Sequence, residues 1–273
     1  MLTLVEAINP NGSMLSLPLW DYTNGFIVSD VEGLDPVHVA LVSTSFAQMH
    51  GRQLQASKRE ARNIRLRLEL DANEVTNTVA SLRQKLYEYF MPDATVTLRF
   101  HTSLGKIFQI QGVVESMDAP LFTREPAVDI SIMCFEPDFL DNNETTISGL
   151  STTTPPGTTV LYDGTIAVGF ELTLNIDRTV STLTFASTSP GGFDRSMEFV
   201  SPLSSGDMLT INTVSGAKGG SLLRGGTAYS ILNAISPESA WMLLEPGSNK
   251  IQVRSPTAGI PFTVSYFEHY GGL

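Results

Sequence analysis

Alternation of apolar and polar residues predicts strands in the first half of the chain. The segment 63–70, NIRLRLEL, places an apolar residue at every second position, and 95–101 does the same. A period of two is typical of a strand with one buried face. A turn at 102–105 then leads into a further apolar segment, so residues 95–116 predict a hairpin followed by a third strand.

One segment follows a helical period instead. Between residues 74 and 90, apolar residues recur three or four positions apart, at Val75, Val79, Leu82, Leu86 and Phe90. This spacing is one stripe of an α-helix. Asp71 or Asn73 can cap its start, and Pro92 stops it because proline disfavours helix in the preceding residue. The stripe must cover an apolar sheet face, which favours an α+β layer or a sandwich with one packed helix.

The second half of the chain predicts only strands. Short alternating runs between 168 and 267 are separated by turns rich in Gly and Pro. This pattern is typical of a two-sheet sandwich or jelly roll. A Thr-, Ser- and Pro-rich segment precedes it, so we expect a first domain at 1–141, a linker at 142–160 and a second domain at 161–273.

Positive charge is concentrated in one segment of an otherwise acidic chain. The net charge is −11, yet six of the 17 basic residues are Arg52, Lys58, Arg59, Arg62, Arg65 and Arg67. Such a segment either docks on an acidic partner, including another copy of the chain, or forms a solvated edge strand guarded by charge. Residues 43–60 show no clean period and predict a long connection, a feature that is usually functional or disordered.

The cysteine Cys134 is the first candidate for chemistry, because acidic residues surround it in sequence. In the strand expected at 128–134 it is in phase with the aliphatic residues and out of phase with Asp129. A buried cysteine behaves as a small apolar residue. We therefore interpret Cys134 as structural.

Other chemistry has little support in the sequence. The four histidines lack metal-ligand spacing, and no G-x-S-x-G or P-loop motif occurs. The Gly-rich segment 216–226 is interpreted as a loop between strands. A sugar could stack on the aromatic residues of the second domain, but we interpret Trp241 as a core residue. The set of possible stacking residues is Tyr162, Tyr229, Trp241, Tyr266 and Tyr270.

Composition and charge limit the class of protein to which the chain can belong. With 273 residues, 42% of them hydrophobic and one cysteine, the chain predicts a globular protein without internal disulfides. No apolar run is long enough for a membrane helix, and the negative charge argues against tight wrapping of nucleic acid. We expect no catalytic residues, no metal, no cofactor and no membrane insertion.

Several motifs in sequence order resemble one family. The strand RNIRLRLEL precedes the helix with LRQKLYEYF, then the strand MPDATVTLRF, and later the turn Phe122-Thr-Arg124-Glu125-Pro126. The second half carries AWMLLEPGSNKIQV and ends in FTVSYFEHYGGL. This order resembles the distal tail protein (Dit) family of long-tailed, siphovirus-type bacteriophages, over nearly the whole chain.

The resemblance implies a structural virion protein at the distal end of the phage tail, made in the host cytoplasm. It implies a tail-tube-like first domain, a galectin-like second domain, and a hexameric ring through which DNA passes without specific binding. The expected partners are the tail tube protein, the tail hub or tip protein, and a fibre or receptor-binding protein. The alternative is a carbohydrate-binding adhesin that recognises the host surface through the second domain.

Overall fold

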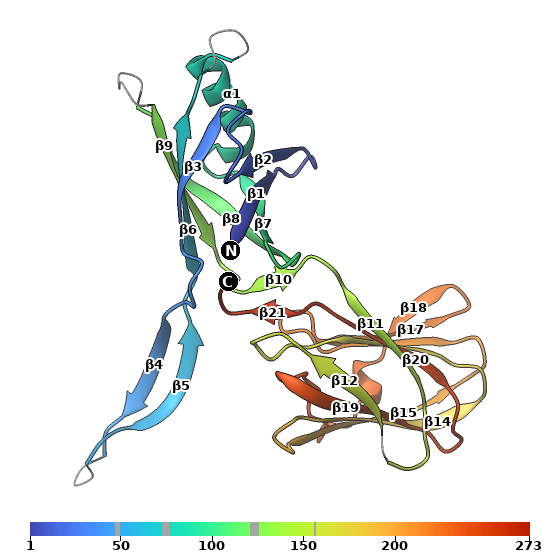
Figure 1. Cartoon of the computed structure of the whole chain (residues 1–273). Coiled ribbons are helices and arrows are strands. Elements are labelled where there is room, and N and C mark those ends of the chain that lie inside the picture. Colours follow the sequence, from blue (N-terminus) through green and yellow to red (C-terminus); the bar gives the residue numbers. More distant parts are fainter. Residues whose placement is uncertain (47–49, 73–76, 121–125, 156) are drawn as a thin grey trace. The chain divides into compact units, whose positions relative to one another are not determined.

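The computed structural model describes residues 1–46, 50–72, 77–120, 126–155 and 157–273 (Figure 1). The chain divides into two compact units, one of Met1–Asn142 with Tyr270–Leu273 and the other of Asn143–His269. The expected linker at 142–160 differs from this division, because it contains strand β11 (Thr145–Leu150) and the start of β12 (Thr158–Tyr162). Both strands pair with strands of the second unit, so most of this Thr-rich segment belongs to the sheets of that unit.

The first unit is built from one long antiparallel sheet, a hairpin and a helix. Its main sheet follows the order β2-β1-β7-β8-β9-β6-β3, and β10 pairs with β8 and β21. The elements are β1 (Leu2–Ile8), β2 (Met14–Pro18), β3 (Phe26–Glu32), β4 (Val39–Thr44), β5 (Gln53–Arg59), β6 (Arg62–Leu70), α1 (Val79–Phe90), β7 (Thr95–Thr102), β8 (Ile107–Asp118), β9 (Ala127–Cys134), β10 (Phe139–Asp141) and β21 (His269–Tyr270), the last of which crosses between the units.

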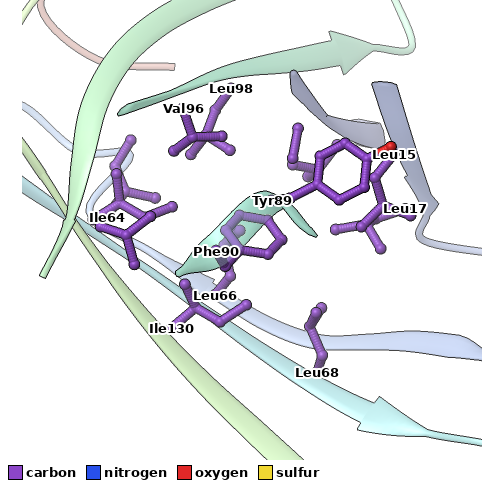
Figure 2. Close-up of a cluster of buried hydrophobic side chains, with 14 of the residues drawn as sticks. Leu15, Leu17, Ile64, Leu66, Leu68, Tyr89, Phe90, Val96, Leu98 and Ile130 are labelled. Carbon is purple, nitrogen blue, oxygen red and sulfur yellow. The ribbon is translucent and has the colours of Figure 1, made fainter. Parts of the chain in front are cut away.

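The apolar face of this sheet and the helix enclose one core. The end strands β2 and β3 lie in contact, so the sheet folds over on itself. Figure 2 shows Tyr89 and Phe90 of α1 among aliphatic side chains from β2, β6, β7 and β9. Phe90 is fully buried, which stabilises the unit by roughly 1.5–3 kcal/mol relative to an exposed ring.

The helix begins later than the sequence predicts. Its N-cap is Thr78, whose hydroxyl accepts from the Ser81 amide while the Ser81 hydroxyl accepts from the Thr78 amide. This capping box satisfies two end amides at once, whereas Asp71 does not cap the helix and Asn73 lies outside the described residues. The predicted stop is confirmed, since Met91 before Pro92 is extended.

The second unit is a sandwich of two antiparallel sheets around its own core. The sheets follow the orders β11-β20-β13-β16-β17-β18 and β12-β19-β14-β15. The remaining elements are β13 (Glu171–Asn175), β14 (Val180–Thr188), β15 (Asp194–Leu203), β16 (Met208–Asn212), β17 (Gly219–Arg224), β18 (Thr227–Ser230), η1 (Leu232–Ala234), β19 (Gly247–Arg254) and β20 (Pro261–Tyr266). The mainly β fold class with one packed helix is confirmed.

One local interpretation of the second unit was wrong. The Gly-rich segment 216–226, expected to be a loop, contains strand β17, which pairs with both β16 and β18. Gly219 and Gly220 lie opposite Asn212 and Ile211, so glycine does not interrupt the ladder.

Candidate subunit interface

Strands β4 and β5 form a hairpin that has no other strand beside it. They make a separate two-stranded sheet, and Figure 1 shows them extending away from β3 and β6. Every residue of both strands is exposed. The sequence interpretation of 43–60 as a long connection was therefore wrong, because Gln53–Arg59 is strand β5, one arm of this hairpin, which is defined here as residues 39–59.

Large apolar side chains are exposed along the hairpin. The exposed fractions are 66% for Leu41, 59% for Leu54 and 57% for Val42, and Val39 and Phe46 are also exposed. The register places Val39, Leu41 and Leu54 on one face and Val42 on the other. An isolated two-stranded hairpin is at best marginally stable in water, and clustered apolar exposure marks a contact surface.

The basic residues of the hairpin have few partners within the chain. Arg52 and Lys58 are exposed and make no ion pair with the described residues, whereas Arg59 is paired with Asp138. The hairpin contains no acidic residue. It is therefore a cationic, apolar arm on a chain whose net charge is −11.

Arg62 does not belong to this exposed group. It is 2% exposed, and its guanidinium donates to four backbone carbonyls. Its burial leaves it unavailable to another subunit, contrary to the interface role expected from the sequence. Burial also lowers the pKa of Arg62 from its ordinary value.

Arg65 and Arg67 lie on the solvent face of β6, where acidic residues of neighbouring strands flank them. Arg67 stands between Asp30 on β3 and Asp129 on β9, and Arg65 lies opposite Glu32. Strand β6 is an inner strand of the sheet, so the alternative of a charge-guarded edge strand does not hold for it, whereas β5 of the two-stranded sheet does have an exposed edge. Its arginines are balanced by their own sheet.

The surroundings of Arg65 and Arg67 form a shallow cleft of about 440 Å³ on the sheet formed by β3, β6, β9 and β8. Its acidic residues outnumber its two arginines, and we call this surface the acidic face. Asp118 and Asp129 lie directly opposite each other across β8 and β9, an arrangement that repels and destabilises. The acidic residues of the acidic face are Asp30, Glu32, Glu115, Asp118 and Asp129.

Cys134 is a structural residue, as predicted. It is fully buried in the core of the first unit, in phase with Ile130 and Ile132. Burial raises the pKa of its thiol to about 11. The thiol is therefore protonated and unreactive at neutral pH.

The aromatic residues proposed for sugar stacking do not form a platform. Tyr162 and Tyr266 are buried and pack against each other, and Tyr270 is buried in the first unit. Trp241 packs partly buried against the core, with the Lys218 amine 5.8 Å from its ring. Only Tyr229 of this set is largely exposed, so the residues supply no paired stacking surface.

Neither a metal cluster nor a membrane helix is found in the part of the chain that the structure describes. No group of three or more His, Cys, Asp or Glu residues is placed to hold a metal ion there. No described helix has the length and hydropathy required to cross a membrane.

Comparisons with known proteins identify the two units separately. Residues 163–270 match the family described as siphovirus-type tail component, C-terminal domain. Residues 21–131 match the phage tail protein RIFT-related domain. A comparison with curated proteins finds no match. The Phe122–Pro126 turn of the family resemblance lies largely outside the described residues.

Solved structures give the same fold. The crystal structure of SPP1 Dit (gp 19.1), described as a paradigm of hub adsorption apparatus in phages infecting Gram-positive hosts, superposes with a TM-score of 0.67 at 15% identity, covering 97% of this chain and 98% of that one. The phage p2 baseplate in its activated conformation, with Ca or Sr, gives TM-scores of 0.45 and 0.44 at 10% and 9% identity. Those matches cover 97% and 96% of this chain and 98% and 97% of theirs.

The two family matches lie in the expected order and together span most of the chain. The fold is that of a Dit protein from end to end. The chain therefore belongs to the siphovirus-type distal tail (Dit) family, and it is a structural component of the phage tail.

Proposed function

We propose that this protein forms a closed ring at the distal end of the tail, in which the hairpin of each subunit docks on the next copy. The observation that carries the proposal is the hairpin itself, whose apolar side chains are exposed on both faces. A ring requires a heterologous contact in which one patch of each subunit meets a different patch of its neighbour. A projecting arm and its docking surface satisfy that requirement.

Charge favours another copy of the chain as the partner on which the hairpin docks. The hairpin has basic residues and no acidic ones, and the rest of the chain carries the acidic excess. Full burial of a large apolar side chain stabilises by about 1.5–3 kcal/mol. The exposed apolar side chains of the hairpin are about half covered already, so each gains about half of this value. Docking therefore contributes roughly 5 kcal/mol per contact between subunits. The resemblance to the family favours six subunits.

Substitution of hairpin leucines tests the contact. The double variant Leu41→Ser, Leu54→Ser removes two apolar side chains that are 66% and 59% exposed. We expect it to weaken each contact by roughly 2 kcal/mol, or about 30-fold, so that rings dissociate in native mass spectrometry at low micromolar concentration.

The matched control is Leu161→Ser in β12 of the second unit, because Leu161 is 64% exposed and Leu41 is 66% exposed. The control should retain the ring. Rings that survive the double hairpin variant as well as they survive the control would refute the hairpin contact.

We further propose that the acidic face lines the channel through which DNA passes. Negative charge along the lumen repels phosphates and keeps the transported DNA from binding. Arg67 lies between two carboxylates and Arg65 lies opposite Glu32, which leaves no cationic track for a phosphate backbone.

Charge reversal tests the assignment of the channel. Rings of the variant Asp118→Lys, Asp129→Lys should retain double-stranded DNA in a salt-dependent manner, whereas wild-type rings should not. The control, Asp194→Lys with Glu198→Lys on exposed positions of β15, makes the same change in net charge elsewhere. Equal DNA retention by both variants would exclude the acidic face as the lining.

For the second unit we propose an adaptor role toward peripheral tail-tip proteins. Its support is a set of apolar side chains exposed on β12, β15, β18 and in the β14–β15 turn. These are Leu161, Phe193, Val200 and Tyr229. Co-purification of the tail-tip protein with the wild-type ring, and its loss with Leu161→Ser, Val200→Ser, tests this role.

A further inference from the structure

The four carbonyls that Arg62 binds come from segments that are far apart in the sequence. Its Nε donates to Pro137 O at 2.7 Å, and its Nη2 donates to Gly271 O at 2.6 Å. Its Nη1 donates to the carbonyls of Gly33 and Asp35. One buried side chain therefore joins the β3–β4 connection, the segment before β10, and the end of the described chain.

All of these contacts lie at the base of the hairpin. Residues 33–38 lead into β4, and two residues separate Arg62 from the end of β5, so the guanidinium holds both arms. The Glu60 amide also donates to His38 O at 3.0 Å, which closes the base. Beyond this point β4 and β5 pair only with each other among the strands of the described residues.

The segment 271–273 packs directly on the β3–β4 connection. The Leu273 amide donates to Leu34 O at 3.0 Å. A Cβ on Gly272 would lie 2.8 Å from Pro36 Cδ and 3.0 Å from Leu34 O. Only glycine allows this close approach without displacing one of the two segments.

The Arg62 side chain is also fixed from one side by Phe139. Its guanidinium carbon lies 4.3 Å from the centroid of that ring, which belongs to β10 and is fully buried. The planar guanidinium can stack on a ring while donating to four carbonyls, whereas a lysine ammonium has three donors on one atom. The arrangement is specific to arginine.

We propose that Arg62 and residues 271–273 form a clamp that fixes the direction of the hairpin. Ring assembly then depends on a segment more than 200 residues away in sequence from the surface that makes the contact. The inference rests on the proposed docking of the hairpin on another copy. It assigns to Arg62 a positioning role, since Arg62 itself is buried and touches no partner.

The variant Gly272→Val tests the clamp, because the added side chain must push 271–273 away from Pro36. The control is Gly219→Val in β17, where a Cβ meets nothing closer than 3.9 Å. Hairpin direction is measured by electron–electron spin resonance between labels at Ser43→Cys in β4 and Gln111→Cys in β8. The buried Cys134 thiol stays unlabelled. Both variants are placed in the monomeric Leu41→Ser, Leu54→Ser background.

We expect a narrow distance distribution for the background and for the Gly219→Val control, and a distribution at least twice as broad for Gly272→Val. In the native-sequence hairpin, Gly272→Val should also weaken ring assembly at least tenfold. Equal distribution widths for Gly272→Val and the control would overturn the clamp, whatever the rings do.

The two proposals fail in different ways. Rings that withstand Leu41→Ser, Leu54→Ser would refute hairpin docking and leave the distance measurement as the test of the clamp. Rings lost with that double variant but retained with Gly272→Val would refute the role of the clamp in assembly alone.

Discussion

Replacement of Arg62 should destabilise the first unit by an amount that can be worked from its contacts. In Arg62→Met, four partly buried carbonyls lose their donor, and such a loss costs about 1–3 kcal/mol for a fully buried group. Since side chains relax and water enters, we expect a total near the lower bound, about 4 kcal/mol. Arg62→Lys keeps a charge and up to three donors from a single point, so we expect about 2 kcal/mol.

Hydrogen exchange followed by mass spectrometry is the appropriate assay, because it reports the two units separately within the intact chain. Core amides of β9 exchange through opening of the first unit, so 4 kcal/mol corresponds to roughly 1000-fold faster exchange in Arg62→Met and 2 kcal/mol to roughly 30-fold in Arg62→Lys. Amides of β13 in the second unit are the internal control and should not change.

Unchanged exchange of β9 amides in Arg62→Met would show that the four hydrogen bonds contribute no stability, and the reasoning about the buried guanidinium would be wrong. Equal acceleration of exchange in β9 and β13 would show that the effect is not local to the first unit. That result would also contradict the stabilising role of Arg62 in this unit.

Further predictions concern titratable groups. The Cys134 thiol should not react with a disulfide reagent at pH 8 until the protein unfolds. Because its folded pKa is about 11 and its ordinary value is 9.0, stability should fall by up to about 1.4 kcal/mol per pH unit as the pH rises from 9 to 11. Asp118→Asn, next to Asp129, should raise the denaturation midpoint by relieving repulsion worth about 0.2–1 kcal/mol. Arg224 holds the pKa of Asp207 below its ordinary value through hydrogen bonds, so Arg224→Gln should make acid unfolding of the second unit begin at a higher pH, as followed by circular dichroism.

The sequence predicted those elements whose two faces differ. Strands β6 and β9 bury one face and expose the other, so their alternation is strong, and it placed Cys134 correctly in the core. The capping box at Thr78 was missed because the apolar stripe appeared to begin at Val75.

The strands of the hairpin were missed for a physical reason, although Arg52, Lys58 and Arg59 within it were expected at an interface. Strands β4 and β5 are exposed on both faces, and a strand whose burial depends on another subunit has no reason to alternate within its own sequence. The position of Arg62 could have been found, because it is in phase with Ile64 and Leu66, and the alternation extended back by two residues places it on the core face. Because the basic residues of 52–67 are close in sequence, they were expected to share one surface. The fold instead places them on the hairpin, in the core and on the acidic face.

The central claim is that the chain assembles with itself through the hairpin into a closed ring. Negative-stain electron microscopy of the purified full chain, at concentrations up to high micromolar, tests it most directly. We expect closed rings with a central channel for the wild-type chain. These rings should disappear in the double variant Leu41→Ser, Leu54→Ser and persist in the control Leu161→Ser. Lone subunits at every concentration of the wild-type chain would contradict it.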